Sequence, residues 1–124
     1  MKFFLFFAIL PFSFLAQTVS YADVGVIVNL NSQESIEIGN YFQAARNIPS
    51  QNIIYVSVPN TEAINDSVFN VLRTQIEASI LNSGIENTLN YLVTTKGVPL
   101  RRSGIDCLVN QGNGDCGSVD SELS

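Results

Sequence analysis

The sequence predicts an α/β fold in which a parallel β-sheet lies between two layers of helices. Three segments, at 24–30, 52–58 and 89–94, are expected to be strands. The first is a compact apolar run rich in β-branched residues, which is typical of a buried strand. Two longer segments with helical periodicity separate the three. Since each connection can hold a crossover helix, the order β-α-β-α-β indicates parallel strands with right-handed crossovers. This is the arrangement of one half of a Rossmann- or flavodoxin-like fold.

The segment that follows the first run carries the start and stop signals of a helix. Asn31 and Glu34 have the spacing of a capping box, which predicts Asn31 as the N-cap. Asn47 tolerates a left-handed C-cap and Pro49 cannot continue a helix, so the helix should end there. The apolar positions at i, i+3, i+4 and i+7 predict the buried face, which consists of Ile38, Tyr41, Phe42 and Ala45.

A second helix is expected to begin between Thr61 and Asp66, after the Pro59 break. Gly84 suits the position just past its C-terminus, and Ile85 can pack back on the last turn. The apolar stripe of this helix consists of Ile64, Val68, Val71, Leu72, Ile76 and Ile80. Periodicity does not decide whether the strand order of the sheet is 2-1-3 or 3-2-1.

Regular patterns stop after Pro99, and residues 101–124 contain several glycines without helical or strand periodicity. We therefore expect an irregular loop segment there. A three-stranded parallel sheet leaves apolar edges and faces uncovered. On this ground we expect residues 23–100 to be the N-terminal half of a larger, incomplete domain, with a partner in further chain after Ser124.

The N-terminal 22 residues have the pattern of an export signal. Lys2 provides a positive start, an apolar run covers 3–15, and Ser20-Tyr21-Ala22 predicts cleavage between Ala22 and Asp23. The alternative is a membrane anchor, but the apolar run is shorter than the ~20 residues that span a bilayer. We therefore expect an exported protein, periplasmic or extracellular, without membrane association once the signal has been removed.

The segment after the predicted cleavage site is acidic. It contains five basic and eleven acidic residues, for a net charge of about −6. Because binding to nucleic acid requires clustered Lys and Arg, this composition argues against a nucleic-acid partner. The acidity also has a simple interpretation as a contribution to solubility.

Two cysteines, Cys107 and Cys116, lie close together in the glycine-rich stretch. In an exported protein such a pair predicts a disulfide. The alternative, a metal site, lacks support because the chain has no His and no second pair of cysteines. We expect no metal. We also expect no nucleotide cofactor, since neither a G-x-G-x-x-G nor a phosphate-loop motif is present.

Two elements resemble those of an uncharacterised family of exported bacterial proteins. They are the sequence TKGVPL at 95–100 and the sequence SVDSEL at 118–123, and the stretch from 26 to 59 adds to the similarity. The resemblance covers nearly the whole segment after the signal. It implies an exported protein with an N-terminal α/β region that continues past Ser124. It implies no activity, because the family has none assigned.

Candidate ligand-binding residues lie in the loop that follows the third strand, since ligands of open parallel sheets bind beyond the carboxyl ends of the strands. Thr95 offers a hydroxyl, and Lys96, Arg101 and Arg102 form a local positive cluster for a carboxylate or phosphate. The alternative is that Lys96 pairs with a nearby acid and both arginines are solvated.

Asp120 and Glu122 are two positions apart, so an extended backbone would place both carboxylates on one side. Such a pair suits a divalent cation or acid–base chemistry. The alternative is an acidic loop in solvent.

Two functions from different classes follow from these observations. The first is an exported binding module that holds a small anionic ligand or a protein partner at its strand-end loops. The second is the N-terminal half of an extracytoplasmic hydrolase, such as a caspase-like peptidase, with catalytic residues beyond residue 124. The absence of His from the sequence excludes a Ser-His-Asp or Cys-His arrangement within these residues.

Overall fold

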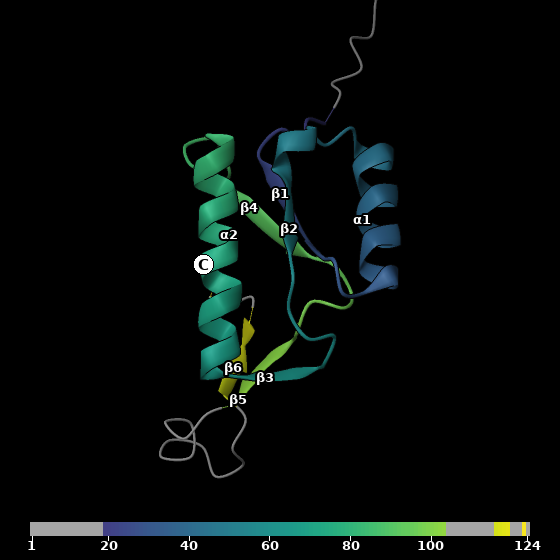
Figure 1. Ribbon diagram of the computed structural model, residues 1–124. Helices are drawn as coiled ribbons and strands as arrows, with labels where there is room; N and C mark the ends of the chain where they lie inside the picture. Colours follow the sequence, from purple (N-terminus) through teal and green to yellow (C-terminus); the bar gives the residue numbers. More distant parts are fainter. Residues whose placement is uncertain (1–18, 104–115, 120–122, 124) are drawn as a thin grey trace, which may run out of the picture.

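The computed structural model describes residues 19–103, 116–119 and 123, without the side chain of Cys116. It confirms the α/β class (Figure 1). The elements, in chain order, are β1 (Val24–Asn29), α1 (Gln33–Arg46), a 3-10 turn (Ser50–Asn52), β2 (Ile53–Val56), β3 (Ala63–Asn65), α2 (Asp66–Ser83), β4 (Tyr91–Thr94), β5 (Arg101–Ser103) and β6 (Cys116–Ser118).

The main sheet has the order β2-β1-β4, and both strand pairs are parallel. This confirms the parallel prediction and selects the 2-1-3 order, which is the flavodoxin-like arrangement. The central strand β1 is buried along its whole length. In Figure 1, α1 and α2 stand on opposite sides of this sheet.

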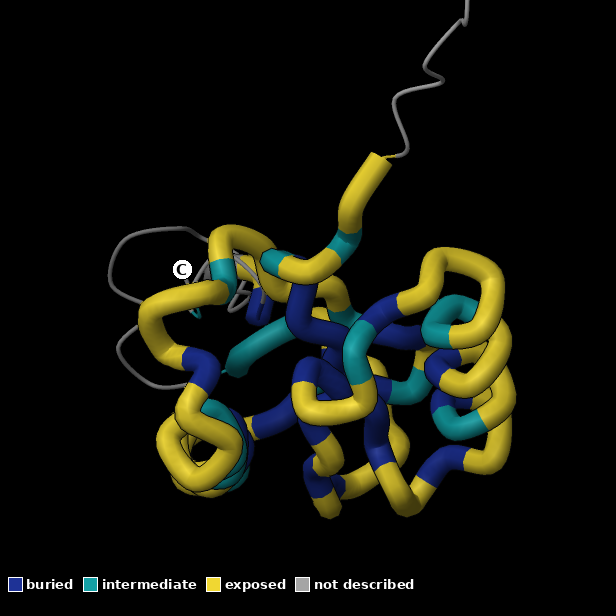
Figure 2. Tube along the Cα trace, turned by 90° about the horizontal axis from the view of Figure 1, so that it is seen from above, coloured by how far each residue is buried: buried dark blue, intermediate teal, exposed yellow. Residues whose placement is uncertain are grey.

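Each helix closes a separate apolar core against one face of the sheet (Figure 2). The α1 face is formed by Val24, Val26, Val28, Ile48 and Ile53, with Tyr21, Ile36 and Phe42 packed against it. The α2 face is larger and contains Ile27, Ile54, Val56, Val58, Ile64, Phe69, Leu72, Ile76, Val98 and Val119. Alternation along β1 explains the division, because odd and even positions of a strand point to opposite faces.

The N-cap of α1 is Ser32, so the prediction of Asn31 was wrong by one residue. The Ser32 hydroxyl accepts a hydrogen bond from the Ser35 amide at 3.2 Å. Asn31 instead donates from its side chain to the Val58 carbonyl at 3.0 Å. Both residue types can cap a helix; the contact between Asn31 and the loop after β2 decides between them.

The predicted buried face of α1 was wrong for three of its four residues. Phe42 packs against the core, but Ile38, Tyr41 and Ala45 are exposed, whereas Ser35 and Gly39 are buried. A Cβ atom on Gly39 would lie 2.5 Å from the Val28 Cγ2 atom, so the helix approaches β1 through its small residues. Because Ser and Gly add little to an apolar pattern, the stripe of larger residues was centred too far toward the solvent face.

The helix ends agree with the prediction. Asn47 and Gly84 both adopt the left-handed C-cap conformation, with φ of 52° and 63°. Ile85 is buried after the end of α2, as expected. The α2 helix begins at Asp66, and its buried residues include Phe69, which the predicted stripe omitted.

Residues 101–124 are not irregular throughout, which corrects the predicted loop segment. β5 pairs in parallel with β3 and antiparallel with β6, in a second small sheet of order β3-β5-β6. Each of these strands has three residues. A strand of that length is too short to display a period of two, so its pairing depends on neighbours that are distant in the sequence.

Candidate functional site

The carboxyl ends of the main strands are joined by the buried side chain of Asn29, the last residue of β1. Its Nδ2 atom donates to the carbonyl oxygens of Gly97 at 2.7 Å and Val58 at 3.1 Å. Its Oδ1 atom accepts from the amides of Asn31 at 3.1 Å and Val58 at 3.3 Å. One amide group thus holds together the loops that follow all three strands of the sheet.

A second buried connection runs through two hydroxyl groups. The backbone N–H of Asn29 donates to the Ser35 hydroxyl at 2.7 Å, and the Thr95 hydroxyl donates to the Ile27 carbonyl at 2.9 Å. The two hydroxyl oxygens are 2.5 Å apart. Since the Thr95 proton is used on Ile27, the Ser35 hydroxyl donates to Thr95. Thr95, predicted as a ligand-binding residue, is therefore fully engaged in joining α1 to β4 and β1.

The loop after β4 passes very close to the start of α1. Gly97 has φ of +101°, a conformation that L side chains rarely adopt. A Cβ atom at this position would overlap the Ser32 side chain, whose Cβ would be only 2.6 Å away. The edge at which ligands of open parallel sheets usually bind is consequently filled by the protein's own backbone and polar side chains.

The three predicted cations do not converge on one ligand. Lys96 pairs with Glu34 of α1 at 2.7 Å, and both side chains are exposed. Arg101 pairs with Glu62 at 3.3 Å. Arg102 pairs with Asp66 at 2.7 Å, and its guanidinium lies 5.1 Å from the centre of the Phe69 ring. Their positive charge is balanced locally by acidic partners, which matches the alternative interpretation for Lys96 and differs from it for the arginines.

Several predicted residues lie outside the described part of the chain. They are Asp120, Glu122 and Cys107, and the side chain of Cys116. The paired carboxylates and the disulfide therefore remain predictions. Within the described residues, no group of three or more His, Cys, Asp and Glu side chains is arranged to hold a metal ion. No helix among them combines the length and apolar character needed to cross a membrane.

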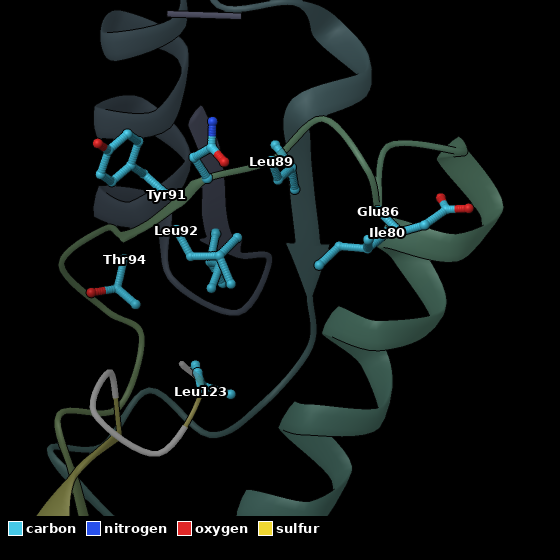
Figure 3. A pocket seen from close by; sticks show the side chains of 9 residues that line it. Ile80, Glu86, Leu89, Tyr91, Leu92, Thr94 and Leu123 are labelled. Atoms are coloured by element: carbon cyan, nitrogen blue, oxygen red, sulfur yellow. The ribbon is translucent and has the colours of Figure 1, made fainter. Parts of the chain in front are cut away.

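An apolar cavity of about 340 Å³ lies beside β4 (Figure 3). Its residues come from β1, the last turns of α2, the loop before β4, β4 itself and the C-terminal segment. The lining consists of Ile27, Ile80, Glu86, Leu89, Asn90, Tyr91, Leu92, Thr94 and Leu123. Among the described residues of this lining, Glu86 is the single charged one.

β4 is the open edge of the main sheet. It pairs with β1 on one side, and the described part of the chain supplies no strand on the other side. Its side chains are apolar yet exposed, at 64% for Tyr91, 37% for Leu92 and 38% for Val93. In a parallel ladder alternate residues point their backbone groups to opposite sides. The Tyr91 amide donates to Asp23, just before β1, and the Thr95 amide donates to Ile27 of β1. The N–H and C=O groups of Leu92 and Thr94 therefore point outward.

The opposite edge of the sheet is protected at its carboxyl end. At the end of β2, the Gln75 side chain of α2 accepts from the Ser57 amide at 2.7 Å and donates to the Ser57 carbonyl at 3.3 Å. These bonds occupy backbone groups that an added strand would need. Natural proteins commonly block sheet edges in this way, and β4 has no comparable cover among the described residues.

The sequence analysis did not identify either feature of this site. Asn29 was not among the predicted site residues, because its role depends on two loops that lie 29 and 68 residues away. The segment 89–94 predicted a strand, which β4 confirms, but nothing in its pattern indicated that the strand is exposed. The signal that was available is the uncovered edge of a three-stranded sheet, which the sequence analysis noted without locating it on β4.

No family model, curated protein or solved structure matches this chain. The site must therefore be interpreted from its own geometry.

Proposed function

We propose that this chain is an exported α/β binding module that accepts an extended protein segment along the outer edge of β4. The observation that carries the proposal is the combination of outward backbone groups at Leu92 and Thr94 with apolar side chains exposed on both faces of the same strand. Addition of a strand to a sheet edge uses the first feature for affinity and the second for side-chain selection.

The energetics support a protein segment over a small anionic ligand. An exposed apolar edge strand is an aggregation hazard when it stays uncovered, whereas the cations proposed for an anion are already in ion pairs. Burial of apolar surface contributes about 25 cal/mol per Å². Burial of three exposed apolar side chains should therefore contribute more binding free energy than an anion gains by displacing the acidic partner of an exposed ion pair.

Export forms part of the proposal and rests on the signal-like N-terminus, with cleavage between Ala22 and Asp23. Cleavage there would remove Tyr21, which packs on the α1-face core and lies 5.3 Å from the Arg46 guanidinium. It would also remove the Ala22 carbonyl that accepts from Asn52 at 2.9 Å. Asn52 would keep its 3.0 Å bond to Val24, and β1 begins only at Val24, so the sheet would remain intact.

The resemblance of TKGVPL and SVDSEL to exported bacterial proteins supports the same compartment. A disulfide between Cys107 and Cys116 belongs to the proposal for this reason. N-terminal sequencing of protein secreted to the periplasm, together with a thiol assay under non-reducing conditions, tests both parts. A start at Asp23 and no titratable thiol are expected; an intact Met1 or two free thiols would contradict them.

The binding function is tested by an NMR titration of the chain that begins at Asp23. The probe is an eight-residue peptide that alternates valine and threonine, and the control peptide has the same composition apart from a central proline. Proline removes a donor and disfavours ladder pairing. We expect the first peptide to shift the amide signals of Leu92 and Thr94, while the signals of Tyr55 and Ser57 at the protected edge stay in place.

The variant Thr94→Pro is the matched test on the protein side. It removes an outward donor and leaves the donors that face β1 unchanged. Binding should be lost, and an unchanged circular dichroism spectrum and melting temperature would show that the fold persists. Equal shifts with the proline peptide, or shifts confined to other elements, would refute strand addition at β4.

A further inference from the structure

The cavity beside β4 combines an apolar floor with an acidic rim. Ile27, Ile80 and Leu89 contribute apolar side chains. Glu86 lies on the α2 side of the lining, and its carboxylate is directed away from β4 (Figure 3). A long aliphatic side chain with a positive end fits such a surface. Lys and Arg bury their methylene groups along apolar surface while the charged end stays in water or meets a carboxylate.

The charges of the domain make Glu86 unusual. Four acidic residues of the described part are in ion pairs, namely Glu34, Glu62, Asp66 and Glu77. Among the other described acids, Glu37 accepts a hydrogen bond from Gln33 on α1, and Asp23 accepts one from Asn90. Glu86 has neither a cation nor a hydrogen-bond donor within that part of the chain. It is also the one that lines the cavity.

We infer that the segment bound at β4 is a basic one, in which a Lys or Arg side chain crosses the cavity and pairs with Glu86 while neighbouring apolar residues pair with β4. This inference rests on the proposed strand addition and specifies its partner. Leu92 and Thr94 line the cavity and also present the outward backbone groups, so a side chain on the α2-facing side of an added strand lies directly beside the cavity. The net negative charge of the domain also favours a positively charged partner.

A double-mutant cycle tests the pairing. The probe peptides carry lysine, methionine or glutamate at one central position of the alternating valine–threonine sequence. Methionine keeps an apolar chain of similar length without the charge. The protein variants are Glu86→Gln and, as a matched control on a different surface, Glu37→Gln. Binding is measured by NMR titration of the chain that begins at Asp23, at low salt and at 1 M salt.

We expect the lysine peptide to bind about twofold to fivefold more tightly than the methionine peptide, which is the range of an exposed ion pair. The glutamate peptide should bind more weakly than both. The lysine advantage should disappear in Glu86→Gln and at 1 M salt, and persist in Glu37→Gln. The protein without peptide should sediment as a monomer.

Two results would overturn the inference and can be distinguished from a failure of the proposed strand addition. If all three peptides bind equally well, strand addition stands and the basic partner is wrong. If the protein alone sediments as a dimer that excludes every peptide, the edge is covered by a second copy of this chain. If no peptide binds to a monomeric protein at millimolar concentration, both the inference and the proposed function fail.

Discussion

The substitution Asn29→Ala is the most direct test of the network that joins the strand ends. It deletes four hydrogen bonds, two donated to Gly97 and Val58 and two accepted from Asn31 and Val58. The Val58 carbonyl keeps a bond from the Asn31 side chain at 3.0 Å. The Asn31 amide also loses its partner, but it belongs to an exposed residue and can bond to water. Two groups, the Val58 amide and the Gly97 carbonyl, are therefore left without the partners that the structure gives them.

The expected magnitude follows from those two orphaned groups. A buried backbone group left without a partner costs roughly 1–3 kcal/mol, so Asn29→Ala should lower the free energy of unfolding by about 2–5 kcal/mol. This is a large part of the roughly 5–15 kcal/mol that stabilises a typical domain. The matched control is Asn31→Ala. It removes an exposed side chain, leaves the Val58 carbonyl bonded to Asn29, and should cost less than about 1 kcal/mol.

Urea unfolding followed by circular dichroism measures both values, since the slope of the transition also reports any change in compactness. The reasoning would be refuted if Asn29→Ala cost less than about 1 kcal/mol. It would also be refuted if the two variants were equally destabilised, because the contribution would then come from general loop packing and not from the buried amide.

Three further predictions concern neighbouring positions. Gly97→Ala should lower the free energy of unfolding by about 3 kcal/mol or more, because it combines a positive φ with overlap on the α1 N-cap. Gly84→Ala, where a Cβ would meet nothing within 4 Å, should lower it by only about 1 kcal/mol. Equal melting temperatures of the two variants would contradict this. Gly39→Ala should cost about 1–3 kcal/mol through overpacking against β1, and a melting temperature at or above the original would show that α1 can move outward. Lys96→Ala should cost less than about 1 kcal/mol because its ion pair with Glu34 is exposed, and a larger loss in urea unfolding would assign it a structural role.

Much of the fold could be predicted from local signals. β-Branched apolar runs predicted β1 and β2. The Asn47 and Gly84 caps end the two helices where the sequence predicts. These signals act over a few residues, through backbone sterics and side-chain burial, so they are legible in the sequence. The parallel pairing also followed, because the connections are long enough for crossovers.

Other features depended on contacts between distant segments. The buried face of α1 was set by Gly39 against Val28, and no periodic pattern reveals a helix that packs through its smallest residues. The strand order required knowing which side of β1 each crossover takes. The short strands β3, β5 and β6 became strands only by pairing with one another.

The candidate site shows the same division most clearly. The residue types of the strand-end loop predicted an anion site, but the structure uses Thr95 to join α1 to β1 and matches Lys96 with Glu34. The sequence alone determined that a three-stranded sheet must leave apolar surface uncovered, because that follows from strand number and composition. Only the tertiary structure decided that this surface is β4, because α2 and Gln75 protect the β2 edge while the described chain leaves the other open.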